Sequence, residues 1–125
     1  MQAVRTGIDL VEIARLAELK DTIRRKFLER VYTEHEINSA GGSNERLAEY
    51  FAAKEAAVKA LGCGIGTVNW RDIEICMGED HSPVLQLYNE ASRLAGQQGL
   101  SGWSVSLSHT TLYALAVVVG YDRAA

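Results

Sequence analysis

The chain has 125 residues, of which 47% are hydrophobic and 23% are charged, and its formal net charge is −3. This length and balance predict one soluble globular domain over residues 1–125. No apolar run is long enough for a membrane span or a signal peptide, and the negative charge argues against nucleic acid as a partner. Two cysteines without metal-type spacing, Cys63 and Cys76, favour free thiols in an intracellular protein, and we expect a cytoplasmic location.

The first thirty residues predict a strand and then helical structure rich in basic side chains. Residues 4–11 are β-branched and apolar enough for a buried strand. Between residues 13 and 28 apolar side chains recur at helical spacing, which predicts one helix or two short helices. The basic residues of this stretch, with acids between them, are Arg15, Lys20, Arg24, Arg25, Lys26 and Arg30. On its own the pattern favours an ordinary helix surface with paired charges, and the alternative is a docking face for an acidic partner.

The middle of the chain predicts two helices with clear end signals. Thr33, followed three residues later by Glu36, is a capping-box pattern that predicts the start of a short helix. Ser43 or Asn44 can cap a long second helix, because short polar side chains accept hydrogen bonds from free backbone N–H groups. This helix should end at residue 61, since the next residue is a glycine suited to the left-handed conformation that closes helices.

The second half of the chain predicts four short strands and one helix. The predicted elements are strands at 73–77 and 84–87 around a turn at 78–83, a helix at 89–98, and strands at 105–108 and 112–119 on either side of a polar turn that holds His109. Strands and helices are therefore mixed without a regular βαβ rhythm. This order favours an α+β domain over a doubly wound α/β fold.

Three ionisable residues on these elements point to chemistry. Glu55 and Lys59 are four residues apart and share one face of the long helix. Asp9 lies in the apolar strand, where a carboxylate is costly without a partner or a cation. Two acids and a lysine in this arrangement are the minimum set for a site that binds a metal and a diphosphate.

Each of these residues also has a simpler interpretation. Glu55 and Lys59 can form a surface ion pair, Lys59 can be a solvated helix lysine, and Asp9 can cap a turn at the end of the strand. Lys54 points about 100° away from its neighbour Glu55 around the helix. The sequence leaves Lys54 open between a substrate contact and a surface position.

Several segments of the chain carry a resemblance to a known family. The chain resembles the holo-acyl-carrier-protein synthases, the small trimeric branch of the 4′-phosphopantetheinyl transferases. The matching segments follow the family's order and cover almost the whole chain: GIDLVEIARL at 7–16, RVYTEHE at 30–36, FAAKEAAVKALGCGIG at 51–66, WRDIEI at 70–75 and SVSLSHTTLYALAVVV at 104–119. The resemblance implies a single domain with a long central helix packed on a mainly antiparallel sheet.

The resemblance also implies a reaction and a metal. Enzymes of this family move the phosphopantetheine arm of coenzyme A onto a serine of apo-acyl carrier protein and release 3′,5′-ADP. Asp9 and Glu55 match the family's Mg²⁺ ligands, and two carboxylates suit that ion. Lys59 matches a residue that faces the diphosphate, and Glu55 has a second possible role in accepting the serine proton. The alternative is an acyl-carrier-binding or coenzyme A-binding homologue with weak or no transferase activity.

Further residues are implied to contact coenzyme A, and two positions depart from the family pattern. The implied contacts are Gly62, Gly64, Pro83, Ser108, His109 and Thr110. The glycines also suit a simple helix end, and a lone histidine is often an ordinary surface or core group. Tyr50 stands where many family members have an arginine suited to a bidentate phosphate contact. Ser82 stands where the family usually has a lysine.

The resemblance finally implies an assembly and a protein partner. It implies a homotrimer with sites between subunits, and the nearly all-apolar residues 112–119 are consistent with a strand that packs on a second subunit. Arg15 matches the family's contact with the acidic acyl carrier protein, and Arg24 and Arg25 lie nearby in the same basic segment.

Overall fold

The computed structural model describes residues 3–64 and 66–123. Its elements are β1 (Val4–Glu12), α1 (Ala14–Ala17), α2 (Asp21–Val31), α3 (Glu34–Ala40), α4 (Asn44–Leu61), the 3₁₀ turn η1 (Trp70–Asp72), β2 (Ile73–Met77), β3 (Pro83–Leu87), α5 (Asn89–Gln97), β4 (Gly102–His109) and β5 (Tyr113–Tyr121). The predicted α+β class is confirmed. Within the described ranges, none of the helices is both long and apolar enough to cross a membrane.

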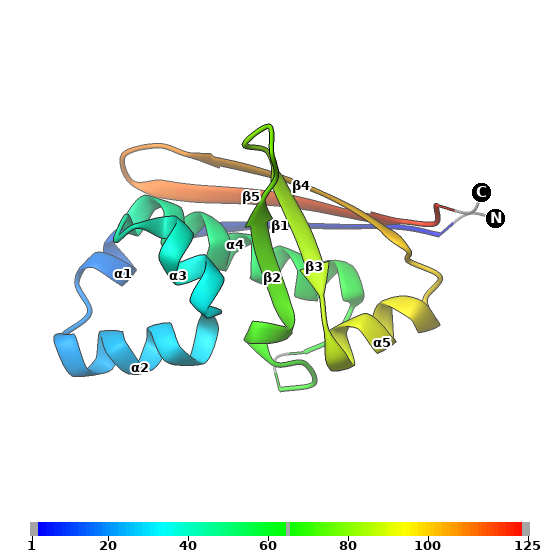
Figure 1. Cartoon of the computed structure of the whole chain (residues 1–125), viewed down its shortest axis with the longest axis horizontal. Coiled ribbons are helices and arrows are strands. Elements are labelled where there is room, and N and C mark those ends of the chain that lie inside the picture. The colour runs from blue at the N-terminus through cyan, green and yellow to red at the C-terminus, as the bar shows by residue number, and fades with distance from the viewer. Residues whose placement is uncertain (1–2, 65, 124–125) are drawn as a thin grey trace.

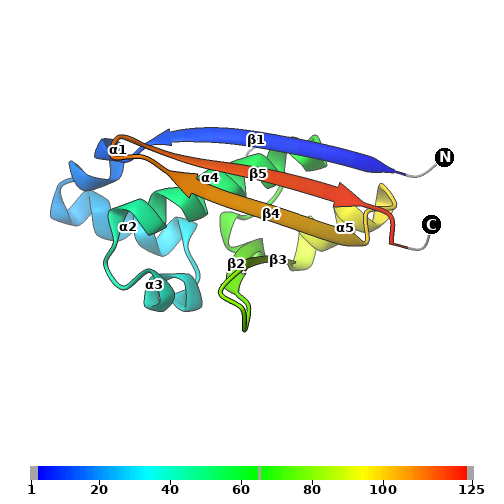
Figure 2. The same ribbon diagram turned by 90° about the horizontal axis from the view of Figure 1, so that it is seen from above.

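The long helix α4 lies under one face of an antiparallel sheet. This sheet has the strand order β1-β5-β4, and a separate antiparallel hairpin is formed by β2 and β3. Figure 1 shows α4 below the three strands, with α1, α2 and α3 at one end and α5 at the other. Seen from above in Figure 2, the three strands lie in front of the helices, and no other described part of the chain covers their outer face.

Small side chains allow α4 to lie close to the sheet. The helix is buried on most of its circumference, and its fully buried alanines include Ala53, Ala56 and Ala60. Gly7 on β1 faces it, and a Cβ atom built at Gly7 would lie 1.8 Å from the carbonyl oxygen of Ala56. Only glycine fits at this contact. The close approach places the strand that carries Asp9 directly against the helix that carries Glu55.

Most predicted helix ends are confirmed. Thr33 caps α3, and both hydrogen bonds of its capping box with Glu36 are present. Ser43, rather than its neighbour, is the N-cap of α4, because its Oγ accepts from the backbone N–H of Arg46. Gly62 closes α4 in the left-handed conformation, with φ of 69°. The helical stretch after β1 forms two helices, α1 and α2, rather than one.

Two predicted turns are shorter than expected, because their strands extend into them. Pro83 is the first residue of β3 and pairs with Met77, a position where the missing N–H of proline is tolerated. His109 is the last residue of β4 and pairs with Ala114, so it does not lie in the turn. The turn itself is held by Thr110, whose Oγ1 accepts two backbone N–H groups.

Candidate active site

Asp9 and Lys59 meet where β1 crosses α4. Asp9 belongs to the face of β1 that points to the helix, and 14% of its side chain is exposed. The Nζ atom of Lys59 lies 2.9 Å from Oδ1 of Asp9 and donates a second hydrogen bond of 2.9 Å to the carbonyl of Ile8. The Lys59 side chain is 56% exposed. The lysine therefore pairs with the acid on the strand, across 50 residues of sequence, and its ammonium group stays open to solvent.

Glu55 completes the cluster as a half-buried carboxyl beside Asp9. Burial raises the pKa of Glu55 to about 7, and the charge of Asp9 and its hydrogen bond to Glu55 act in the same direction. Lys59 and Arg15 oppose this rise with their positive charges. Asp9 and Glu55 repel each other at the edge of a buried contact, so an additional positive charge close to both would be favourable. The raised pKa also makes Glu55 a group that can exchange a proton near neutral pH.

The chemistry of this donor set fits a hard divalent cation. Asp9 and Glu55 present carboxylate oxygens to each other, and a cation held between them would relieve their repulsion. Within the described ranges, no group of three or more His, Cys, Asp or Glu side chains could hold a metal ion. Two carboxylates are the usual protein contribution to a Mg²⁺ site, where water and substrate phosphate supply the other ligands.

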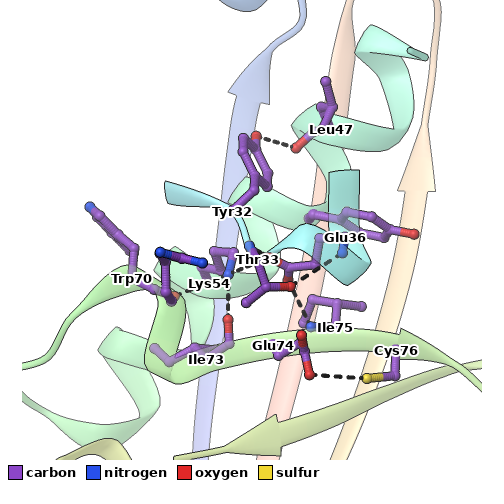
Figure 3. A network of polar contacts seen from close by, with 12 residues as sticks. Tyr32, Thr33, Glu36, Leu47, Lys54, Trp70, Ile73, Glu74, Ile75 and Cys76 are labelled. Atoms are coloured by element: carbon purple, nitrogen blue, oxygen red, sulfur yellow. Dashed lines mark hydrogen bonds and ion pairs between the residues drawn. The ribbon is translucent and has the colours of Figure 1, made fainter. Parts of the chain in front are cut away.

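Lys54 is neither a substrate contact nor a surface residue, so both sequence interpretations of it are wrong. It is fully buried, and its Nζ atom lies 2.8 Å from Oε1 of Glu36, which is fully buried as well. Nζ also donates to the carbonyl groups of Trp70 and Ile73 (Figure 3). The second oxygen of Glu36 accepts the backbone N–H of Ile75 at 2.8 Å. This network joins α3, α4 and β2 on a different face of α4 from the one that carries Glu55.

The glycines after α4 have distinct backbone roles. Gly62 and Gly66 have positive φ angles of 69° and 102°, which favour glycine over other residues. Gly64 has no such angle, and a Cβ atom there would meet nothing within 4 Å. Ile65, inside the same segment, lies outside the described residues. Gly66 likewise has nothing within 4 Å of its Cβ position, so the surroundings of Gly64 and Gly66 are both open, whereas a Cβ at Gly62 would lie 3.2 Å from Nη2 of Arg5.

The other sequence-predicted residues for coenzyme A lie on separate elements. Ser108 and His109 are neighbours at the end of β4, so their side chains lie on opposite faces of the sheet. The hydroxyl of Thr110 is used within the β4–β5 turn. Pro83 begins β3 at the tip of the other hairpin, next to Ser82, which hydrogen-bonds to Asp80. The structure brings together Asp9, Glu55 and Lys59. It does not place Pro83, Ser108, His109 and Thr110 around that cluster.

The three arginines of the predicted docking face have different surroundings. Arg24 is half-buried and already partnered, because its guanidinium donates to the carbonyl of Leu16 and to Oδ1 of Asn44. Arg25 is exposed and lines a cavity of about 490 Å³ beside α2 and α3. Arg15 is exposed on α1, and its charge lowers the pKa of Glu55. Arg15 is therefore the arginine that links this surface to the acid cluster.

Residues 5–118 match the family model of the 4′-phosphopantetheinyl transferase superfamily. The chain belongs to this superfamily. Curated relatives agree: the holo-[acyl-carrier-protein] synthase of Carboxydothermus hydrogenoformans is 43% identical over 117 residues, which cover 91% of this chain and 94% of the relative. That of Koribacter versatilis is 42% identical over 123 residues, with 94% and 97% covered. The chain is therefore a phosphopantetheinyl transferase, as its sequence motifs predicted.

Solved structures support the same assignment. The crystal structure of Helicobacter pylori holo-[acyl-carrier-protein] synthase in complex with coenzyme A has a TM-score of 0.83 and 34% identity, and covers 92% of this chain and 98% of that chain. The enzyme from Neisseria meningitidis has a TM-score of 0.82 and 34% identity, with 93% and 96% covered. The fold of this transferase is thus the fold of holo-[acyl-carrier-protein] synthases.

One departure of this transferase from the family pattern has a structural explanation. Tyr50, at the position where the resemblance leads us to expect an arginine, is fully buried. Its hydroxyl lies 2.9 Å from Oγ of Ser39 at the end of α3, within hydrogen-bonding distance. Position 50 of this chain therefore contributes to the interior. Any phosphate contact from this part of α4 has to come from another side chain.

Proposed function

We propose that this transferase moves the 4′-phosphopantetheine group of coenzyme A onto a serine of an apo-acyl carrier protein, depends on Mg²⁺ and releases 3′,5′-ADP. The observation that carries the proposal is the Asp9–Glu55–Lys59 cluster at the contact of β1 and α4, in a chain of this superfamily. The relatives named holo-[acyl-carrier-protein] synthase, one of them solved with coenzyme A, support the choice of donor and acceptor.

Each member of the cluster has a role in this reaction. The serine hydroxyl oxygen bonds to the phosphorus that carries the pantetheine arm, the bond to the bridging oxygen breaks, and 3′,5′-ADP leaves with the electron pair. Asp9 and Glu55 hold Mg²⁺, which when bound neutralises charge on the diphosphate. Lys59 reaches the diphosphate from its exposed position and stabilises the negative charge on the leaving group. We also assign to Glu55 the acceptance of the serine proton, because its carboxylate lies in the same cluster as the metal and diphosphate contacts.

The remaining contacts with coenzyme A follow the sequence expectation. We assign them to the backbone of Gly62 and Gly64, to Pro83, and to Ser108, His109 and Thr110. The open surroundings of Gly64 and the half-exposed ring of His109 support two of these contacts. Because Ser108 and His109 lie on opposite faces of β4, the contacts that these two residues of one chain make are on different faces of the sheet.

A transfer assay tests the proposed reaction directly. The protein is incubated with Mg²⁺, coenzyme A and an apo-acyl carrier protein, and the mass of the carrier is measured. A gain of one phosphopantetheine unit is the expected result. Binding of coenzyme A or of the carrier without any mass gain would instead support the alternative, a binding homologue with weak or no transferase activity.

Arg15 provides a test of the carrier-docking surface. We propose that an acidic carrier protein docks on α1 and α2 through Arg15, with Arg25 and Arg24 beside it. Exposed charges of this kind chiefly raise the association rate. Arg15→Glu is therefore expected to raise KM for the carrier roughly tenfold and KM for coenzyme A far less, in steady-state assays at low salt.

The matched control for this prediction is Arg93→Glu, the same charge reversal on α5 at the opposite end of the molecule (Figure 1). It is expected to leave both KM values within a factor of two. Equal increases for both substrates after Arg15→Glu, or no change at all, would contradict a docking role for Arg15.

Exposed apolar side chains of β1 and β5 on the uncovered outer face of the sheet (Figure 2) support a trimer. An antiparallel sheet with one face in water normally carries polar residues on that face. Here Ile8 and Leu10 on β1 are 57% and 58% exposed, and Val117 on β5, paired with Ile8, is 37% exposed. We propose that this apolar face packs against neighbouring subunits in a homotrimer, with each active site formed between two chains.

Val117→Glu tests the assembly and the shared site together. It would place an unpaired carboxylate in each apolar interface, at a cost of several kcal/mol. We expect the trimer to dissociate and transfer activity to fall at least tenfold, although Val117 contacts no substrate in this proposal. Light scattering beside the transfer assay measures both effects.

Val84→Glu is the control, because Val84 is an exposed strand valine on the other hairpin, 41% accessible. It should change neither assembly nor activity. A monomeric Val117→Glu variant with full activity would disprove the shared site. A parent protein that is already monomeric would disprove the interface.

A further inference from the structure

Glu49 is a buried acid that the proposed reaction does not use. It lies on α4, and only 6% of its side chain is exposed. Its Oε1 lies 3.4 Å from Nη1 of Arg46, one turn earlier on the helix, and its Oε2 lies 3.2 Å from Nδ1 of His109 at the end of β4. The two basic side chains are 40% and 48% exposed. A single buried carboxylate thus links two side chains that both reach the surface.

This arrangement restricts how the two basic groups point. Because Nδ1 of His109 faces Glu49, the other ring nitrogen, Nε2, is left to interact outside the pair, and it has no hydrogen-bond partner among the described residues. Arginine has many rotamers, and an ion pair that fixes one of them lowers the entropy lost when a ligand binds. An acid with only a packing role would need no charge at a position this buried. The contacts therefore indicate that Glu49 acts through its neighbours.

We propose that Glu49 is a positioning residue that holds Arg46 and His109 side by side as a paired binding site for a phosphate group of coenzyme A. This inference rests on the proposed function, which already places His109 near coenzyme A, and adds Arg46 as a contact and Glu49 as its support. A phosphate oxygen at Nε2 requires that both ring nitrogens of His109 donate, as they do in the imidazolium form. Glu49 then receives the Nδ1–H and compensates the charge of the ring.

Glu49→Gln distinguishes support of Arg46 and His109 from direct repulsion of the phosphate, because the two predict opposite signs. If Glu49 were only a nearby negative charge, its removal would strengthen phosphate binding. If it orients Arg46 and His109, its removal weakens that binding. We expect Glu49→Gln to raise KM and Kd for coenzyme A about tenfold, while kcat stays within a factor of two and KM for the carrier is unchanged. Glu45→Gln, which removes an exposed acid from the first turn of the same helix, should leave all of these values unchanged.

Two further measurements make the test specific. Arg46→Gln and His109→Gln change exposed side chains, and each should raise Kd for coenzyme A in the parent but have a much smaller effect when Glu49→Gln is already present. Dephospho-coenzyme A identifies the phosphate: a Glu49→Gln effect that disappears with this ligand assigns the binding site to the ribose phosphate, and one that persists assigns it to the diphosphate. Calorimetric binding gives Kd without any need for turnover.

The outcomes separate this inference from the proposed function. A parent that binds no coenzyme A would overturn both. A parent that binds and transfers normally, with a Glu49→Gln variant that binds coenzyme A as tightly or more tightly, would overturn only the positioning role. Fully additive effects of the three substitutions would overturn it as well.

Discussion

Replacing Asp9 with Asn, or Glu55 with Gln, is expected to lower the rate of phosphopantetheine transfer by roughly 10²-fold or more at ordinary Mg²⁺ concentrations. Each change removes one of only two carboxylates in the cluster and keeps the size of the side chain. The loss should appear in kcat/KM and in a higher Mg²⁺ requirement, measured by the transfer assay across a magnesium titration. Glu12→Gln, which removes an exposed acid from the same strand, is the matched control and should retain full activity.

Glu55→Gln should not weaken the fold, because Glu55 and Asp9 repel each other in the metal-free protein. The pKa of Glu55 is about 7 in the folded protein, against an ordinary value of 4.5. The folded state therefore binds more protons than the unfolded state between these values, and the stability that Glu55 contributes is lost as pH rises through about 7. Thermal unfolding in a chelator should show this loss in the parent, and Glu55→Gln should remove it.

Two results would contradict this account of the cluster. If either variant turned over within a few-fold of the parent, the substituted residue would not be a ligand. If Glu55→Gln kept the parent's stability loss between pH 5 and about 7, the carboxyl that titrates there would not be Glu55.

Local signals in the sequence were sufficient for most of the elements. Thr33 and Glu36 predicted the start of α3 because a capping box needs only two residues three positions apart. The shared helix face of Glu55 and Lys59 followed from helical geometry in the same way. The pairing of Lys59 with Asp9 depends on the close packing of β1 on α4 at Gly7, and a contact across 50 residues leaves no periodic signal.

The residues that sequence reasoning misplaced all depend on such distant contacts. Glu36 was recognised only as a capping residue, although it also binds Lys54 and the N–H of Ile75. Glu49 was not singled out, because its partner His109 lies 60 positions away. A partial signal existed for Lys54: it shares its side of the helix with Ala53, Ala57 and Val58 at helical spacing, which is typical of a buried face. A lysine at such a position needs an acid inside the protein.

Lys54→Met is expected to destabilise the folded protein by about 3–5 kcal/mol, the usual cost of breaking a buried ion pair by removing one partner. Burial lowers the pKa of Lys54, and the charge of Glu36 together with its hydrogen bond partly restores it. Without the ammonium group the carboxylate of Glu36 stays buried and uncompensated, and the carbonyl groups of Trp70 and Ile73 lose a donor. Urea unfolding at a fixed protein concentration measures the loss.

The double variant Glu36→Gln with Lys54→Met separates the charge from the packing. A neutral glutamine keeps an oxygen that can accept the backbone N–H of Thr33 or Ile75, so the second substitution should recover part of the stability that Lys54→Met lost. Lys26→Met, the same change at an exposed position of α2, should shift the free energy of unfolding by less than about 0.5 kcal/mol. If Lys54→Met were as mild as Lys26→Met, or if the double variant were no more stable than Lys54→Met alone, the ion pair would not be what joins α3, α4 and β2.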